Sequence, residues 1–426
     1  MARLSPSPPP SSPPRSGLHR RAFVCGIALL VATALCWAAW VVADALGRPW
    51  ALGLPAVEVH GLALTFGFMP SFFAGFLFTM APRWLRQPPL PPAALAPTLA
   101  AQAAGWSLFL VGAHASAARA ASLAALGLGL AALGWMLAWA RLVGLLRAGR
   151  GAERAHLDVV ATAGGIGAAA MIAAAAGLAL GALPLVRAAT LAGLWIFVGG
   201  TFAGAAHRMI GFLGAALPAL DARRPRAMLH ALAALFAIEG AGAALEAWGG
   251  PPPPALRLAQ AVLEAGAGAG LLALCMRWRA LQGSHVRFIA MLQAAFLWLA
   301  SAFLLAGASH AGALRAGGDV AILGAAPLHA YTVGFLGTTM LAMVSRVACG
   351  HAGRTVVADD LLWRLFLLLQ AAALARVGGG LLSSLGAAGG AHLVVAAACL
   401  WAVVWSAWAL RVVPWLAREK KRGDLG

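Results

Sequence analysis

Charged residues are scarce in this chain. Only 10% of its 426 residues are charged and 62% are hydrophobic, whereas a soluble domain carries about a quarter charged residues. So much apolar surface cannot be hidden in a water-soluble core, and lipid must cover it. The composition therefore excludes a soluble globular protein and predicts an integral membrane protein with the lipid bilayer as its main partner.

Acidic residues and tyrosine are also few, with 13 Asp and Glu residues, one Tyr and a formal net charge of +18. A basic balance can indicate nucleic-acid binding. Here, however, the basic residues stand singly or in small groups between apolar runs. No basic stripe is interleaved with aromatic residues, as in proteins that bind single strands. The pattern excludes nucleic acid as a partner and is typical of loops that set membrane orientation.

Paired cysteine motifs are absent. The five cysteines form no CxxC pair and no CxxCH motif, which excludes a zinc knuckle and a covalently attached c-type haem and gives no sign of a disulfide framework. The chain also has neither a GK[ST] phosphate loop nor an HExxH motif. Any metal or haem must therefore be held mainly by histidine, methionine or carboxylate side chains.

Long apolar runs are what the chain does contain. Twelve of them approach the 20 or so residues that cross a bilayer as a helix. We predict an all-α, polytopic membrane protein whose helices form one bundle over residues 19–416. A Pro/Ser-rich disordered tail (1–18) precedes the bundle and a basic tail (417–426) follows it. The predicted spans are 22–46, 57–81, 92–112, 120–140, 157–180, 188–212, 228–248, 255–276, 287–307, 325–348, 360–382 and 391–415.

The positions of the basic residues predict the orientation of these spans. With the N-terminus inside, 25 of the 31 Lys and Arg residues fall in inner segments and 6 in outer segments. Basic residues concentrate on the cytoplasmic side of membrane proteins. We therefore expect a protein of the bacterial inner membrane with both termini in the cytoplasm.

Two histidines begin predicted spans at similar depth. His60 lies in the first turn of the second span and His329 one turn into the tenth, both on the outer side. Two neutral imidazoles on facing helices are what a six-coordinate haem iron requires, so a non-covalent haem is one hypothesis. The other is a pair of interfacial histidines bonded to backbone or lipid headgroups. His310 and His392 are further outer-side candidates.

A second group of histidines lies toward the inner side. His207 ends the sixth span and His351 follows the tenth, both at the cytoplasmic ends of helices that run inward. Imidazole suits copper, and two histidines would need a third ligand, for which His230 and Met209 are available. The alternative is an electropositive inner surface without a metal.

Several ionisable residues fall inside predicted spans, where charge is costly. Glu239 and Glu246 lie in the seventh span, Glu264 in the eighth and Arg376 in the outer half of the eleventh. One interpretation is an ion pair between Arg376 and a carboxylate. The alternatives are a proton path from Glu239, or Arg376 binding a haem propionate through a charge-assisted hydrogen bond.

Three stretches resemble one protein family. The segment HAYTVGFLGTTMLAMVSRVACGHAGR (329–354), the segment GFLFTMAPRW (75–84) and the segment AHRMIGF (206–212) are similar to the NnrS family. The resemblance covers residues from about 20 to 415. It implies a multi-pass inner-membrane protein that contains haem and copper and takes part in the nitric oxide response of denitrifying and related bacteria, with nitric oxide or iron–nitrosyl species as its partners.

A second similarity lies inside the first. The segment HGLALTFGFMP (60–70) resembles the second-helix signature of haem–copper oxidase main subunits, although Leu64 departs from it. This similarity implies a haem–copper-oxidase-like helix arrangement and ligation of a b-type haem by His60 and His329. The binuclear copper site of that family is not matched, because the chain has no His-His pair and no HPEVY-like run.

Three functions remain open on the sequence. The first is an NnrS-like haem-binding protein, with copper as a further metal, that protects cells from nitrosative stress. The second is a transporter or channel without redox chemistry, since twelve spans also fit transporter folds. The third is a divergent nitric oxide or oxygen reductase, which the missing copper ligands disfavour. Whether the protein is an enzyme is therefore left open.

Overall fold

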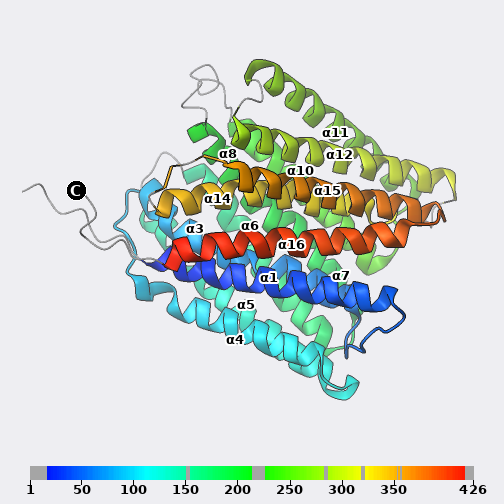
Figure 1. Ribbon diagram of the computed structural model, residues 1–426, viewed down its shortest axis with the longest axis horizontal. Coiled ribbons are helices and arrows are strands. Elements are labelled where there is room, and N and C mark those ends of the chain that lie inside the picture. The colour runs from blue at the N-terminus through cyan, green and yellow to red at the C-terminus, as the bar shows by residue number, and fades with distance from the viewer. Residues whose placement is uncertain are drawn as a thin grey trace, which may run out of the picture.

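A computed structural model describes residues 17–149, 154–213, 226–282, 286–317, 322–352, 354–355 and 357–417. Within these ranges, twelve helices are long and apolar enough to cross a membrane, and they lie side by side as one bundle (Figure 1). The prediction of an all-α protein with twelve spans is confirmed. Apart from residues 17, 18 and 417, the two predicted tails lie outside the described residues.

Nine of the twelve spans are single helices. The predicted boundaries agree with the observed ones to within about five residues, except that three helices run on beyond residues 140, 276 and 307. His310 therefore lies inside a helix. The nine are α1 (Leu18–Ala45), α4 (Ala96–Ala113), α5 (Ala117–Ala148), α6 (Arg154–Ala179), α10 (Arg226–Gly249), α11 (Pro254–Gln282), α12 (Arg287–Arg315), α15 (Asp360–Ser384) and α16 (Gly390–Ala417); a short 3₁₀ turn, η2 (Pro92–Leu95), precedes α4.

The second, sixth and tenth spans are each interrupted by a π-helical segment. A π-helical turn is wider than an α-helical one and is frequent at functional sites. All three begin with a short α-helix, widen into the π segment, and continue as a longer α-helix. The elements are α2 (Ala56–Leu62), η1 (Ala63–Gly67) and α3 (Met69–Trp84); α7 (Leu183–Ala192), η3 (Gly193–Gly199) and α8 (Gly200–Leu213); and α13 (Ala326–His329), η5 (Ala330–Gly337) and α14 (Thr338–Ala352).

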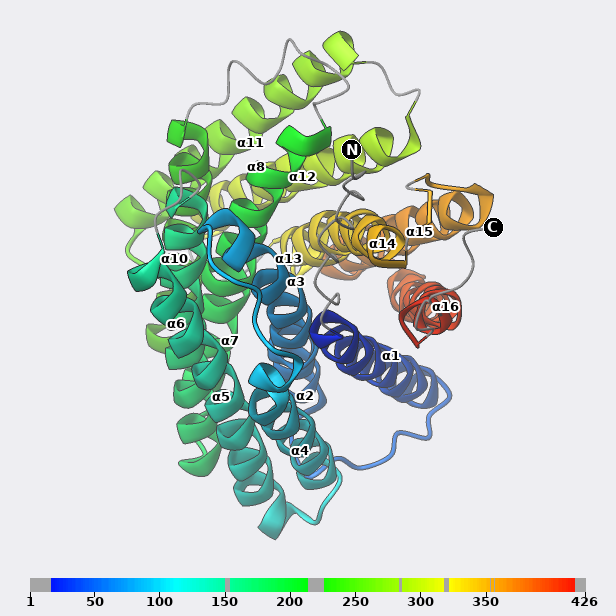
Figure 2. The same ribbon diagram turned by 90° about the vertical axis from the view of Figure 1, so that its left-hand side faces the viewer.

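These three interrupted spans lie at the centre of the bundle. In their most apolar windows, 83%, 56% and 67% of the residues are buried, against 17–50% in the other nine spans of the described chain. Seen along the helix axes, they are enclosed by the outer helices, with α4, α5, α6 and α10 along one side and α1 and α16 on another (Figure 2). Segment η1 packs against η3, and η5 packs against α12 and α15.

Glycine makes the close approach of the π segments feasible. A Cβ atom at Gly193 in η3 would collide with the ring of Phe66 in η1, and one at Gly199 would collide with the hydroxyl of Tyr331 in η5. Small residues allow membrane helices to approach closely. Such close packing stabilises their association, because apolar helices gain no hydrophobic stabilisation from leaving lipid. The aromatic side chains of the two neighbouring spans occupy the space that these two glycines leave.

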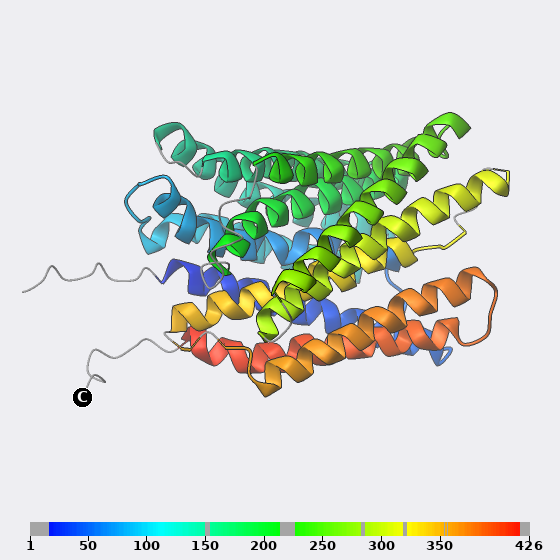
Figure 3. The ribbon, with the colours of Figure 1, turned by 90° about the horizontal axis from the view of Figure 1, so that it is seen from above.

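The helices alternate in direction, so α1 begins and α16 ends at the same end of the bundle (Figure 3). We call this end the His207 end, because α8 carries His207 there. The opposite end, where α1 ends and α2 begins, is called the His60 end. Under the predicted orientation, the His207 end faces the cytoplasm and the His60 end faces the periplasm.

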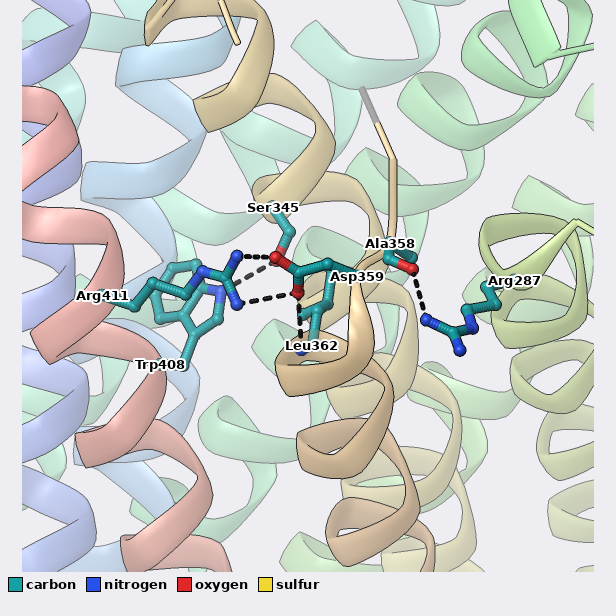
Figure 4. A network of polar contacts seen from close by, with 7 residues as sticks. All are labelled: Arg287, Ser345, Ala358, Asp359, Leu362, Trp408 and Arg411. Carbon is teal, nitrogen blue, oxygen red and sulfur yellow. Dashed lines mark hydrogen bonds and ion pairs between the residues drawn. The ribbon is translucent and has the colours of Figure 1, made fainter. Parts of the chain in front are cut away.

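A polar network holds α14, α15 and α16 together at the His207 end (Figure 4). Asp359 caps α15 by accepting a hydrogen bond from the Leu362 amide at 3.1 Å, and it forms an ion pair with Arg411 of α16. Trp408 donates its indole N–H to the hydroxyl of Ser345 at 2.8 Å. The hydrogen bond from Arg411 holds the pKa of the Asp359 carboxyl below its usual value.

The loop between α14 and α15 is also attached to α12 and α16. Arg287 at the start of α12 donates a hydrogen bond to the Ala358 carbonyl at 3.1 Å and pairs with Asp360 at 2.7 Å. The guanidinium of Arg354 lies 4.6 Å from the ring centre of Trp415 in α16, within the range of a cation–π interaction. These contacts fix the end of the tenth span relative to the last two helices.

Candidate functional site

His60 and His329 occupy equivalent positions in two central spans. His60 ends the short helix α2 just before η1, and His329 is the last residue of α13 before η5. Both side chains are half-buried. They lie within electrostatic range of each other, and Arg376 of α15 lies within electrostatic range of both. The three residues that the sequence suggested for haem binding are thus brought together near the His60 end.

The hydrogen bond of His329 determines which of its ring nitrogens is available. Nδ1 lies 2.8 Å from the carbonyl oxygen of Ala325, one turn earlier. Because a carbonyl only accepts, Nδ1 carries the proton and Nε2 has its lone pair exposed. A histidine that ligates a metal usually donates its other N–H in this way, which orients the ring.

His60 is positioned by an aromatic contact. Its imidazole stacks on the indole of Trp37 in α1, with ring centres 3.8 Å apart and planes inclined by 29°. Its Nδ1 is buried and has no hydrogen-bond partner among the described residues. An orphaned buried nitrogen is unfavourable in a folded protein, and ligation of a metal would satisfy it.

An ion pair connects the helix of His60 to the sixth span. The guanidinium of Arg187 in α7 donates to the carboxylate of Glu58 at 2.6 Å. Glu58 is only 4% exposed and lies two residues before His60. The pair therefore fixes α2 against α7 at the end of the bundle where the two candidate ligands lie.

A recess opens beside His60. Its wall includes Trp37, Trp40 and Trp50, together with Leu110 and His114 near the end of α4. The lining is mainly apolar, so the recess suits a flat or small apolar ligand more than an ion. It gives a space next to the imidazole in which a cofactor edge or a neutral molecule could be accommodated.

A second cavity lies between α1, α3, α8 and α14. Its lining is entirely apolar and includes Phe72, Phe202, Met69, Met340 and Met343. Methionine is flexible and polarisable and adapts to irregular contents. No charged group lines this cavity, which fits neutral apolar molecules.

Of the inner histidines suggested for copper, the structure describes the side chains of His207 and His230. His207 contacts His156 at the start of α6, with Nδ1 of His207 3.0 Å from Nε2 of His156. His230 is exposed on α10. The side chains of His351 and Met209 lie outside the described part of the chain. In that part, no cluster of three or more His, Cys, Asp or Glu residues has the arrangement of a metal site.

The comparison with known proteins now identifies the family. The chain matches the family described as NnrS protein over residues 16–420. It belongs to the NnrS family. No curated protein matches it.

The three NnrS-like stretches fall on the three central spans. Residues 75–84 lie in α3, residues 206–212 lie in α8, and the stretch that begins at His329 runs through η5 and α14. These spans are also the three with π segments. These stretches therefore lie at the centre of the bundle, and two of them contribute Phe76, Met340 and Met343 to the lining of the second cavity.

Sequence reasoning missed several contacts around these residues. Trp37 and the Glu58–Arg187 pair support His60, and His156 at the start of α6 contacts His207. A weak signal existed for the ion pair, because Arg187 is one of the six predicted outer basic residues. Nothing in the local sequence indicated which helix would bring a partner to His207.

Arg376 was expected either to pair with a carboxylate or to bind a propionate. In the described residues it forms no ion pair with a carboxylate. Glu246 pairs instead with Arg257, and Glu264 contacts His310. The guanidinium of Arg376 therefore remains available near the two histidines.

Proposed function

We propose that this NnrS-family protein binds a b-type haem non-covalently through His60 and His329. In this proposal it serves the nitric oxide response in the bacterial inner membrane, with both termini in the cytoplasm. The observation that carries the proposal is that two half-buried imidazoles at equivalent places in two π-interrupted central spans lie within electrostatic range of each other. Each has a nitrogen that the described protein leaves available.

The donor atoms fit a haem iron. Imidazole is a common ligand of haem iron, so the orphaned Nδ1 of His60 and the Nε2 of His329 would hold it. Arg376 would bind a haem propionate, because guanidinium and carboxylate form strong charge-assisted hydrogen bonds. Bound haem would supply a one-electron redox centre that reacts with nitric oxide. The chain itself supplies the ligands, a cation and an apolar surround.

The apolar linings of the two cavities favour a neutral substrate such as nitric oxide. Nitric oxide is small and uncharged, so it partitions into lipid and apolar pockets. The recess beside His60 and the Phe- and Met-lined cavity are both largely apolar. Neither offers a strongly charged pathway, which disfavours an ion channel.

Copper is the second cofactor in this proposal. His207 would bind it at the His207 end, and His156 is the second imidazole closest at hand. Imidazole is a suitable copper ligand, but two imidazoles need a third donor. His351 is at the end of α14 on the same side of the bundle and was the other ligand suggested by the sequence.

The optical spectrum of the purified full-length protein tests the haem proposal. We expect a reduced low-spin haem band in the wild type, which His60→Ala and His329→Ala each abolish or strongly shift. Arg376→Gln should weaken haem retention without removing the band. His392→Ala is the control, since His392 is exposed at the start of α16. Acid–acetone should extract the haem, because no CxxCH motif is present to bind it covalently.

The same preparations separate the alternative functions. Full haem retention in both histidine variants would overturn the assignment of the ligands. A folded wild-type protein without haem would favour a transporter. Consumption of nitric oxide or oxygen by the reduced protein would favour a reductase. Growth of a strain lacking the gene under nitric oxide, with wild-type or His60→Ala protein supplied, tests the biological role independently.

A further inference from the structure

The recess beside His60 is separate from the other residues of the proposed haem site. Its lining comes from α1, from the segment 46–55 that connects α1 to α2, from the first part of the second span, and from the end of α4. Neither His329 nor Arg376 lines it. The recess therefore lies on the side of His60 that faces α1 and α4, and it can hold a ligand of its own.

The recess opens toward lipid. Helices α1 and α4 lie at the outside of the bundle (Figure 2), and α1 packs mainly against α16 and α3 rather than against α4. Cys36 lines the recess and is exposed, and its neighbour Leu35 is 50% exposed. On α4, Val111 follows the lining residue Leu110 and is 63% exposed. Exposed apolar side chains within a span face acyl chains, so a molecule dissolved in the membrane can enter between α1 and α4.

The lining of the recess extends from the surface of the His60 end into the membrane. Trp50 lies in the segment between α1 and α2 and is 40% exposed. Thr33 lines the inner part and lies about 18 Å before the end of α1 at Ala45, at about 1.5 Å of rise per residue. The recess thus joins the membrane surface to the apolar interior, as the site of a molecule with a polar head and an apolar chain would.

Stacked aromatic rings form one wall of the recess. The imidazole of His60 lies on the indole of Trp37, with ring centres 3.8 Å apart. The indoles of Trp37 and Trp40 are nearly parallel, with ring centres 5.5 Å apart and planes inclined by 16°, and Trp50 adds a third indole to the lining. Offset stacking stabilises aromatic pairs at centroid separations of about 4.5–7 Å. A planar ring can extend this stack, whereas an acyl chain gains nothing from it.

His114 supplies a hydrogen-bond acceptor to the recess. Its Nδ1 lies 2.8 Å from the carbonyl oxygen of Leu110, one turn earlier. Because a carbonyl only accepts, Nδ1 carries the proton and Nε2 keeps its lone pair. Among the described residues, no Asp, Glu, Lys or Arg side chain lines the recess, which therefore offers no counter-charge to a phosphate headgroup. The lining favours a neutral, planar molecule that carries a hydroxyl group.

We propose that this recess binds the head of a membrane quinol, an isoprenoid hydroquinone, with its ring against the indoles of Trp37 and Trp40 and one hydroxyl donating to Nε2 of His114. A hydroquinone head is planar and uncharged, carries hydroxyl groups on opposite edges, and has an apolar chain that stays in lipid. These properties match the aromatic wall, the imidazole acceptor and the opening between α1 and α4. A diatomic gas needs neither the wall nor the acceptor. The proposal concerns binding alone and does not rest on bound haem.

A fluorescent quinol analogue, 2-heptyl-4-hydroxyquinoline N-oxide, tests the recess. It is titrated into the full-length protein in nanodiscs of phosphatidylethanolamine and phosphatidylglycerol, and its fluorescence is quenched when it binds. We expect saturable quenching that decylubiquinol reverses. His114→Ala should raise the dissociation constant roughly fivefold, the effect of one lost hydrogen bond. His392→Ala is the control, because His392 is exposed and lies outside the recess. Quenching that added phosphatidylglycerol reverses as well as decylubiquinol does would indicate a lipid site and overturn the proposal.

A variant that fills the recess completes the test. Cys36→Trp should abolish saturable quenching, since it places an indole in the recess at an exposed position. Leu35→Trp is its matched control, because Leu35 is the adjacent residue, is exposed and does not line the recess. His329→Ala should bind the analogue like the wild type, so loss of haem and loss of the quinol site are distinguishable. Absence of saturable quenching in the wild type, equal affinity in Cys36→Trp and Leu35→Trp, or unchanged affinity in His114→Ala would each contradict the assignment.

Discussion

The rings of His156 and His207 are hydrogen-bonded to each other, with the two nitrogens 3.0 Å apart. Both side chains are buried, at 8% and 7% exposed, and they come from α6 and α8, which pack together. Burial of an imidazole is costly unless it is hydrogen-bonded. An ordinary polar surface therefore does not explain two buried imidazoles in contact. The pair is therefore the best starting point for the proposed copper site.

We expect His207→Ala and His156→Ala each to lower the copper content of the purified protein strongly. Loss of one imidazole from a site with few ligands typically costs most of the affinity. His351→Ala should have the same effect if it supplies the third ligand. The control is His114→Ala, since His114 is an exposed residue that bonds to its own helix. Unchanged copper in both His207→Ala and His156→Ala would remove this site.

The orientation of the bundle is tested by reporter fusions. A reporter enzyme that is active only in the periplasm should be inactive after residue 150 and active after residue 315. The first position follows α5, the fourth span, and the second ends α12, the ninth. The concentration of Lys and Arg on one side supports this arrangement. If both fusions report the cytoplasm, the predicted orientation is wrong.

Gly199→Ala should destabilise the protein, because the added methyl group would meet the hydroxyl of Tyr331. Overpacking of a well-packed core costs about 1–3 kcal/mol. The expected result is a lower thermal unfolding midpoint in detergent. Gly129→Ala is the matched control, since a Cβ atom at Gly129 in α5 meets open space. Equal midpoints for the two variants would contradict the close packing of η3 and η5.

Asp359→Ala should destabilise the His207 end. The substitution removes both the N-terminal cap of α15 and the ion pair with Arg411. Loss of a capping side chain typically costs about 0.5–2 kcal/mol. Asp359→Asn separates the two effects, because asparagine can still cap a helix but cannot pair with Arg411. We expect its unfolding midpoint to lie between those of Asp359→Ala and the wild type.

The carboxyl group of Asp359 also makes the stability of the folded protein depend on pH. Arg411 lowers the pKa of Asp359 in the folded protein, so the folded protein binds this proton less readily than the unfolded chain does. The resulting stabilisation is present above the ordinary aspartate pKa of about 3.9 and is lost as the pH falls through the lowered value. Acidification over that range should lower the unfolding midpoint more in the wild type than in Asp359→Asn. Parallel curves would contradict the ion pair.

The sequence determined the twelve spans because lipid leaves the backbone no alternative. Every N–H and C=O group inside the membrane must bond within the protein, so a long apolar run forms a helix whatever its neighbours are. The depth of a residue in the membrane follows from its position along an apolar run. His60 and His329 could therefore be placed at the same depth. The NnrS-like stretches could likewise be read directly from the residues.

The tertiary structure decided which side chains meet. Whether His207 faces His156, or His310 faces Glu264, depends on how each helix is rotated and packed, and apolar Ala- and Gly-rich helices carry little signal for this. The π segments were equally hidden; in η3, Gly193 and Gly199 lie against the aromatic side chains of the neighbouring spans, which the local sequence does not reveal. Sequence therefore set the helices and their depth, and packing between distant helices set the sites.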